Sequence, residues 1–337
     1  MSTDYRYRAD PLTAPTVDLI AAVEGEPVES SEGEAAERRD ACATEAMHSM
    51  RLDKVLVEMA PEFSRSHLQT LIEGGHVWVD GLSAVTASRK VKAGQRVVVE
   101  LMPTLESQAF RPEAMALDIV FEDADLLVLN KTAGRVVHPA AGNWSGTLLN
   151  GLLAHHKAAA TLPRAGIVHR LDKDTSGLMV VGKTLQAVTA LVRAIAAREV
   201  HRQYLAIAHG VLAQRQLRID APIGRDPQSR IRMAVVPGGK SAVTDVERIA
   251  HTALYSAVRC TLHTGRTHQI RVHLASRGHP LVADAVYGGA AALGMQRQAL
   301  HATRLEFAHP GHGQAMAFHA EPPADFEAAW MQVTAPR

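Results

Sequence analysis

Apolar residues first recur at regular spacing near residue 50. Leu52, Val55, Leu56 and Met59 follow the three- and four-residue spacing of one helix face, and the pattern stops before Pro61. The spacing therefore predicts a helix over 52–59.

A second helix is predicted after Ser64, whose hydroxyl is suited to cap a first turn. Its apolar stripe consists of Leu68, Leu71 and Ile72. Gly74-Gly75 ends this helix, and two strands are predicted over 76–79 and 96–101, with a turn at 80–81. Residues 49–102 thus form one small domain of two helices and a hairpin.

From residue 117 to about 330, short β-rich runs alternate with helical segments and Gly/Pro turns. Strands are predicted over 126–130, 177–183, 203–209 and 258–262, and one long helix over 185–198. This order favours an α+β domain with a mixed, largely antiparallel sheet flanked by helices. Residues 103–116, which contain Pro103 and Pro112, are interpreted as a linker.

The first 48 residues have little apolar periodicity and a strongly acidic composition. Four arginines and eleven acidic residues give this segment a net charge of −7, so the remaining chain carries +8. We expect 1–48 to be a disordered acidic tail. The basic remainder suits a polyanionic partner, although an ordinary slightly basic protein has the same charge.

Other classes of protein are disfavoured by what the sequence lacks. Cys42 and Cys260 are too few for a disulfide framework or a four-cysteine zinc site, and the 18 histidines include no His-Glu-x-x-His. Gly239-Lys240-Ser241 is not a phosphate-binding loop, because Ala234 stands where its first glycine belongs. Neither an apolar run of 18 residues nor a signal-peptide pattern occurs. We expect a cytoplasmic protein without a metal.

One polar turn lies between two apolar runs, at residues 167–177. Asp172 within it would present its carboxylate at a sheet edge beside a cleft. Aspartates in turns also commonly cap their own loop backbone, and on this segment alone that interpretation is favoured.

A second cluster, residues 264–273, alternates polar and apolar positions and is predicted to be a strand. Ile270 and Val272 would lie on its apolar face, with basic side chains on the other. Basic side chains there would hold a neighbouring carboxylate ionised and would bind phosphates.

The small domain resembles the S4 RNA-binding domain. The matching segments are 51–53, 64–66, 72–77, 79–81 and 91–95. The resemblance implies that Arg51, Lys54 and Arg65 contact RNA. The same charges would also be found on an ordinary solvated helix face.

Residues 169–184 resemble the signature of the RluA family of pseudouridine synthases. The likeness continues, in family order, through 202–206, 264–273, 279–289, 298–302 and 307–310. The sequence departs from the family pattern at Thr132, where proline is usual, and at His201-Arg202, which replaces the more usual basic pair. Together with the S4 domain, the likeness is to members that act on the large ribosomal subunit.

The resemblance implies the pseudouridine synthase fold and a reaction that needs no cofactor. Asp172 would be the carboxylate that attacks the sugar C1′, attacks the uracil or deprotonates the sugar, and the sequence leaves these routes open. Tyr204 would stack on the uracil and assist in removing its C5 proton. Arg271 would pair with Asp172, and Arg266 is a less favoured alternative for that pairing.

The resemblance also implies the substrate contacts. Arg170 would fill the gap left when the target base swings out, and Ile270 would supply an apolar wall. The partner would be 23S rRNA of the large-subunit precursor, at helix 69, and the protein would act as a monomer. Three alternatives remain: other 23S rRNA or tRNA sites, a non-enzymatic S4-type ribosome assembly factor, and a nucleoside hydrolase. The hydrolase is disfavoured because it would usually need a second acid or a metal.

Overall fold

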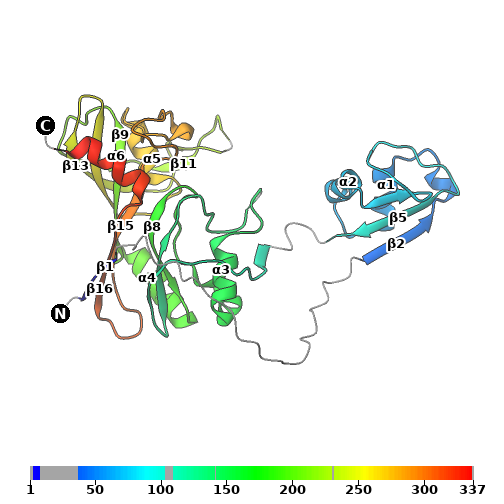
Figure 1. The fold of residues 1–337 in the computed structure, drawn as a ribbon, viewed down its shortest axis with the longest axis horizontal. Helices are drawn as coiled ribbons and strands as arrows, with labels where there is room; N and C mark the ends of the chain where they lie inside the picture. Colours follow the sequence, from blue (N-terminus) through cyan, green and yellow to red (C-terminus); the bar gives the residue numbers. More distant parts are fainter. Residues whose placement is uncertain (1–2, 8–36, 103–108, 141, 230, 336–337) are drawn as a thin grey trace, which may run out of the picture. The chain divides into compact units, whose positions relative to one another are not determined.

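The computed structural model describes residues 3–7, 37–102, 109–140, 142–229 and 231–335 (Figure 1). The chain divides into a smaller unit, residues 14–108, and a larger unit, residues 109–337 with residues 1–13. No helix in the described ranges is long and apolar enough to cross a membrane.

The smaller unit packs two helices and a four-stranded sheet around one apolar core. Its elements are β2 (Glu37–Cys42), α1 (Leu52–Met59), α2 (Arg65–Glu73), β3 (Val77–Val79), β4 (Leu82–Ser83) and β5 (Arg96–Leu101), with sheet order β2-β5-β3-β4. Leu56, Leu68 and Val97 are fully buried in that core. The Ser64 hydroxyl accepts the His67 N–H at 3.3 Å, as expected for an N-cap.

Strand β2 corrects the prediction that residues 1–48 are a disordered tail. It pairs antiparallel with β5 along its whole length, and a short 3₁₀ turn follows at Glu45–Met47. Arg39 pairs with Glu37 on the same strand and with Glu62 in the turn after α1. An edge strand buries neither face deeply, so it shows no apolar periodicity in the sequence. Thr3–Tyr7 forms β1 in the larger unit, and residues 8–36 lie outside the described residues.

The larger unit is built on a ten-stranded sheet, ordered β10-β13-β14-β9-β15-β8-β7-β6, with β16 beside β15 and β1 beside β16. Two pairings are parallel, β1 with β16 and β8 with β15, and the others are antiparallel. This confirms the predicted mixed, largely antiparallel sheet. Its strands are β1 (Thr3–Tyr7), β6 (Ile119–Glu122), β7 (Leu126–Lys131), β8 (Ser176–Gly182), β9 (His201–His209), β10 (Gln216–Asp220), β13 (Val243–His251), β14 (Tyr255–Leu262), β15 (Leu300–Ala308) and β16 (Ala315–Ala320). A separate hairpin consists of β11 (Ile223–Arg225) and β12 (Met233–Val235).

Alternation along β9 separates the two faces of this sheet. Tyr204 and Ala206 belong to the core that also contains residues of α3 (Leu148–His155) and α5 (Gln269–Ser276). Ile207 faces the opposite side, where α6 (Ala324–Thr334) packs (Figure 1). The fourth helix, α4 (Leu185–Ala197), buries Leu191 against β7 and β8.

Residues 264–273 do not form the predicted strand. They make a turn that leads into α5, and Gln269 through Leu274 are all buried. A short helix buried on every side has no solvent-facing stripe, so its sequence does not reveal the helical period. The Gln269 side chain accepts from the Thr264 hydroxyl and the Arg266 N–H and donates to the Val243 carbonyl, which fixes the turn.

The described half of the predicted linker, residues 109–116, is attached to the larger unit. The Asn150 amide donates to the carbonyls of Ala109 and Arg111, and the Asn150 carbonyl accepts the Glu113 N–H. Ala109 is correspondingly buried.

Candidate active site

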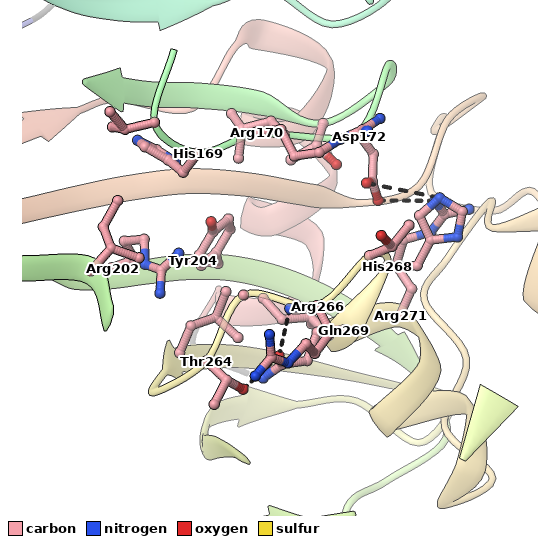
Figure 2. Close-up of a pocket in the computed structure, with 18 of the residues that line it drawn as sticks. His169, Arg170, Asp172, Arg202, Tyr204, Thr264, Arg266, His268, Gln269 and Arg271 are labelled. Carbon is pink, nitrogen blue, oxygen red and sulfur yellow. Dashed lines mark hydrogen bonds and ion pairs between the residues drawn. The ribbon is translucent and has the colours of Figure 1, made fainter. Parts of the chain in front are cut away.

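A cavity of about 550 Å³ opens on the face of the sheet that α5 covers (Figure 2). Six arginines line it, whereas Asp172 is the one acidic residue among the described lining residues. The arginines are Arg164, Arg170, Arg198, Arg202, Arg266 and Arg271. The cavity therefore has room for a nucleoside-sized ligand and a positive surplus that favours anions.

Asp172 lies in the turn before β8 and pairs with Arg271 on α5. Nη1 of Arg271 donates to Oδ2 of Asp172 at 3.0 Å, and the two side chains are 6% and 16% exposed respectively. The predicted pairing of these two residues is confirmed. Arg266 lines the same cavity, but its Nε donates to the Ser241 carbonyl at 3.0 Å and not to Asp172.

Asp284 orients the guanidinium of Arg271 from the other side. Nε and Nη2 of Arg271 donate to the two carboxylate oxygens of Asp284 at 2.8 and 2.9 Å, and the ring of Tyr287 lies 5.1 Å below the guanidinium carbon. Burial alone would lower the pKa of Arg271, but the bond from Asp284 and the charges of both aspartates raise it above its ordinary value. This bidentate pair with Asp284 fixes the plane of the guanidinium, so that Nη1 of Arg271 is directed at Asp172.

His268 approaches the second carboxylate oxygen of Asp172. Its Nε2 lies 3.8 Å from Oδ1 of Asp172, and its Nδ1 is hydrogen-bonded at 2.8 Å to the hydroxyl of Tyr287. That hydroxyl also accepts the Met233 N–H at 3.0 Å. Burial lowers the pKa of His268, and its backbone is left-handed at φ 57°, a conformation that side chains other than glycine rarely adopt.

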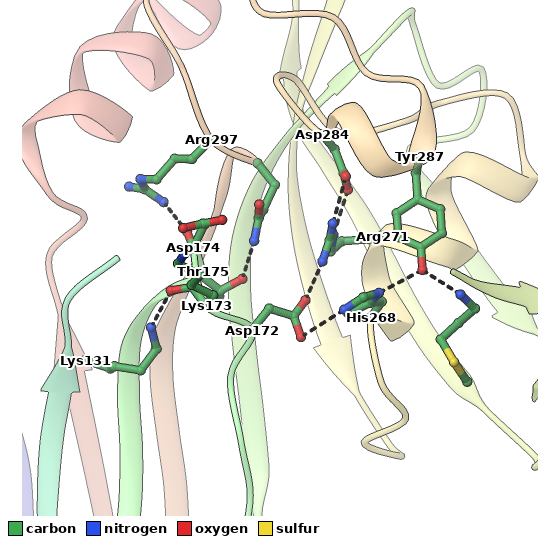
Figure 3. Close-up of polar contacts among 12 residues, drawn as sticks. Lys131, Asp172, Lys173, Asp174, Thr175, His268, Arg271, Asp284, Tyr287 and Arg297 are labelled. Atoms are coloured by element: carbon green, nitrogen blue, oxygen red, sulfur yellow. Dashed lines mark hydrogen bonds and ion pairs between the residues drawn. The ribbon is translucent and has the colours of Figure 1, made fainter. Parts of the chain in front are cut away.

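The turn that carries Asp172 is held through its backbone carbonyls (Figure 3). Nζ of Lys131 donates to the Lys173 carbonyl at 2.9 Å, and Nη1 of Arg297 donates to the Asp174 carbonyl at 3.0 Å. The Gln298 amide donates to the Thr175 hydroxyl. These contacts leave the Asp172 side chain free to face the cavity.

Lys131 is itself almost fully buried. Its ammonium also donates to the carbonyls of Thr132 and Arg135, at 2.9 and 3.0 Å. Burial lowers the pKa of Lys131 from 10.5 to about 7, although the charges of Asp174 and Asp172 oppose that shift. The amine is thus close to its titration point near neutral pH.

Gly177 allows β8 to leave this turn close to β15. A Cβ at this position would lie 2.2 Å from the Ala302 carbonyl oxygen, and the φ of 116° is strained for residues that have a side chain. Glycine is required here by both the space and the backbone conformation.

The other predicted site residues of the larger unit line the same cavity. Tyr204 projects from β9 and is 5% exposed, and burial raises the pKa of its phenol. Ile270, at the start of α5, is 3% exposed. Arg170 is exposed at the cavity wall, two residues before Asp172.

The smaller unit has its own buried aspartate, Asp53, between two of the predicted RNA-binding arginines. Nη2 of Arg51 and of Arg65 donate to Oδ2 of Asp53 at 3.1 and 2.8 Å, and the Gln69 amide donates to the same oxygen. The bond from Arg51 lowers the pKa of Asp53 far below its ordinary value, even though its burial opposes this. Lys54 is exposed one position further along α1.

No sequence pattern predicts a role for Lys131, His268, Asp284 or Tyr287. His268, Asp284 and Tyr287 lie inside segments that resemble the synthase family, at 264–273 and 279–289, and Lys131 precedes Thr132, where the sequence departs from the family pattern. Their contacts join residues that are distant in the sequence, so only the folded structure reveals which of them meet Asp172.

Two protein families match the chain. The family described as RNA pseudouridylate synthase matches residues 125–276, and the S4 domain matches residues 50–97. The two matches fall in the larger and the smaller unit respectively.

Individual relatives match most of the chain. A ribosomal large subunit pseudouridine synthase D from Neisseria meningitidis is 50% identical over 288 residues, which are 82% of this chain and 76% of that protein. One of the same name from Xanthomonas campestris is 44% identical over 315 residues, or 90% of this chain and 92% of that protein. Among solved structures, human RNA pseudouridylate synthase domain containing 1 is similar with a TM-score of 0.51 and 27% identity. That match covers 68% of this chain and 90% of the human chain.

Proposed function

This chain belongs to the RNA pseudouridylate synthase family, as a synthase of the type that acts on large-subunit ribosomal RNA, and we propose that Asp172 is its catalytic carboxylate. The observation that supports Asp172 most directly is its ion pair with Arg271 at the wall of a nucleoside-sized, arginine-rich cavity.

Isomerising uridine requires the N1–C1′ glycosidic bond to break, the uracil to rotate, and a C5–C1′ bond to form; the C5 proton is then lost to solvent and N1 gains a proton. Each step is an internal rearrangement, so the pyrimidine needs neither oxidant nor reductant. In our proposal, one oxygen of Asp172 is held by Arg271 while the other faces the cavity and acts on the sugar or the base. Preorganisation by Asp284 means that this geometry exists before the substrate arrives.

Tyr204 and Ile270 would enclose the uracil in this scheme. Both line the cavity, and the buried phenol of Tyr204 remains protonated because burial raises its pKa. A stacked base cannot reach Asp172, so the target nucleotide must leave the helix, and Arg170 would occupy the gap. Arg266 would contact the RNA backbone at the cavity rim.

The finer substrate proposal is helix 69 of 23S rRNA, which rests on the resemblance to D-type synthases. Arg51, Lys54 and Arg65 of the S4 domain would add phosphate contacts that weaken as salt increases. We propose further that the protein acts as a cytoplasmic monomer on the large-subunit precursor.

Two measurements test this proposal. Pseudouridines of 23S rRNA are mapped in a deletion strain by chemical modification and primer extension, and tritium release from C5-labelled rRNA is measured with purified protein. Asp172→Asn should reduce tritium release by at least about 10³-fold, equivalent to about 4 kcal/mol of transition-state stabilisation.

The matched control is Asp174→Asn, which neutralises a carboxylate of the same turn that does not line the cavity. This variant should restore pseudouridine formation in the deletion strain. Unchanged tritium release by Asp172→Asn would exclude the catalytic assignment. Pseudouridines missing from the deletion strain only outside helix 69 would overturn the substrate site and leave the chemistry standing.

A further inference from the structure

Three buried side-chain nitrogens have no hydrogen-bond partner within the described part of the chain, and all three belong to residues that line the cavity. They are Nε2 of His138, Nδ1 of His169 and Nε of Arg202. An unpaired buried polar group is destabilising, so proteins rarely keep several in one place without a use. Their concentration in one cavity indicates groups that await a ligand.

His169 is a hydrogen-bond donor at this position. Its Nε2 accepts the Val180 N–H at 3.1 Å, so that nitrogen must hold a lone pair. Burial, together with the nearby charge of Arg202, lowers the pKa of His169 to about 3, so the ring is neutral. The single ring proton must then be on Nδ1, the nitrogen without a partner.

Arg202 is a buried cation with no carboxylate partner among the described residues. It is 6% exposed and projects from β9 on the same face as Tyr204, two residues away. Gly265 packs against it, because a Cβ at that position would lie 2.9 Å from Nη1 of Arg202. Keeping a cation buried without a counter-ion is costly, so its natural complement is an anion from outside the protein.

The position of this pair relative to Asp172 fits a polynucleotide. In Figure 2, Tyr204 lies between Arg202 and Asp172, so a base stacked on Tyr204 would have the carboxylate on one side and the pair on the other. Asp172, the one acidic side chain among the described residues that line the cavity, is paired with Arg271, and no ion pair joins it to Arg202.

We propose that His169 and Arg202 form a subsite for one phosphate of the RNA strand, adjacent to the target uridine. Nδ1–H of His169 and the guanidinium of Arg202 donate to the phosphate oxygens. This inference rests on the proposed function and adds to it a specific anchor inside the cavity. A uracil carbonyl would accept the same donors, but it would leave the charge of Arg202 unbalanced.

The salt dependence of RNA binding distinguishes these two ligands. The probe is a stem-loop of 23S rRNA that contains a uridine mapped as above, and its dissociation constant is measured from 50 to 400 mM KCl. Neutralising one phosphate contributes about 0.7 to 0.9 to the slope of log K against log salt concentration. Arg202→Gln should therefore lower that slope by about this amount and weaken binding about tenfold at low salt.

Two further variants distinguish the effect of the Arg202 charge from that of the His169 hydrogen bond, and a third serves as the control. Arg202→Lys should keep the slope, because it keeps the cation. His169→Gln retains an acceptor for the Val180 N–H but loses the Nδ1 donor, so it should weaken binding severalfold without changing the slope. Arg193→Gln removes an exposed arginine of α4 that does not line the cavity, and is the matched control. If Arg202→Gln changes the slope no more than Arg193→Gln does, the phosphate subsite is wrong.

A chemical test alters the RNA and begins with the unaltered protein. Each phosphate near the target uridine is replaced in turn by an uncharged methylphosphonate. At one position the substitution should weaken binding about tenfold to the unaltered protein but not to Arg202→Gln. Pseudouridine formation on the same stem-loop is measured in parallel. No product from the unaltered protein would contradict the proposed function, whereas product without any sensitive phosphate would contradict only the subsite.

Discussion

Asp53 in the smaller unit and Asp172 in the larger unit are both held by arginine, but their surroundings differ. Asp53 is fully buried, and two arginines and a glutamine converge on one of its oxygens. Asp172 is 16% exposed and lines a cavity; a single arginine holds one of its oxygens, and the other oxygen has only His268 nearby, at 3.8 Å. The first arrangement satisfies the carboxylate, and the second leaves half of it available.

The difference lies in where the protein places its supporting contacts. Around Asp53 they are made to the carboxylate itself, so this residue ties α1 to α2. Around Asp172 they are made to the neighbouring backbone and to Arg271, through Lys131, Arg297 and Asp284. A reactive side chain can thus be held in place by restraining the groups around it.

The largest effect is expected where support for Asp172 depends on a fully buried charge pair. Asp284→Ala leaves the guanidinium of Arg271 buried with only Asp172 as its partner, and should lower the free energy of unfolding of the larger unit by about 3–5 kcal/mol. Urea denaturation of a Trp78→Phe background measures this, because the remaining tryptophans, Trp144 and Trp330, lie in the larger unit.

A milder variant separates positioning by Asp284 from stability. Asp284→Asn should still fold, with kcat reduced about 100-fold and the KM for rRNA nearly unchanged, because Asp284 is buried and is not among the residues that line the cavity. A fall in kcat no larger than that of the surface variant Asp220→Asn would mean that Asp284 has only a structural role.

The same substitution should have opposite consequences at the two aspartates. Asp53→Asn directs an amide at the donors of Arg51, Arg65 and Gln69, and should destabilise the smaller unit by about 3 kcal/mol. Backbone amide hydrogen exchange should then become faster in α1 and α2 alone. Tritium release from C5-labelled rRNA should persist at saturating rRNA. Asp172→Asn should abolish that chemistry and change stability by less than about 1 kcal/mol. Equal losses of stability in the two variants would contradict the distinction between a structural Asp53 and a catalytic Asp172.

Sequence patterns predicted those elements that have one buried face and one exposed face. Helices at 52–59 and 185–197 each have one apolar face, so their period is visible. Strand β2 buries neither face deeply and α5 is buried all round, so neither shows the period of its own structure. For these elements the tertiary environment determines the conformation.

The candidate site shows the same limit. Asp172 and Arg271 are 99 residues apart, and it was the family resemblance that joined them before the structure did. On its own segment, Asp172 was better explained as a turn cap. The ion pair of Asp284 with Arg271, and the donors of His169 and Arg202 that have no partner among the described residues, depend on distances between segments far apart in the chain. No local sequence pattern contains those distances.

The smallest effect concerns Lys131, which supports the turn of Asp172 from behind and has no counterpart beside Asp53. Its pKa is lowered from 10.5 to about 7 in the folded protein. Between these values the unfolded chain binds the proton and the folded chain does not, so the free energy of unfolding should rise with pH. The slope reaches about 1.4 kcal/mol per pH unit once Lys131 is fully deprotonated in the folded protein. Because the group is only half deprotonated at pH 7, the total rise between pH 7 and 8.5 is about 1.6 kcal/mol. Urea denaturation in the Trp78→Phe background, with and without Lys131→Met, isolates this contribution from that of other titrating groups.

The Lys131→Met protein should be less stable overall, because three carbonyls lose their donor, and its stability should depend less on pH. Parallel pH profiles for the two proteins would show that Lys131 keeps its proton throughout, and that its support of the turn does not change near neutral pH.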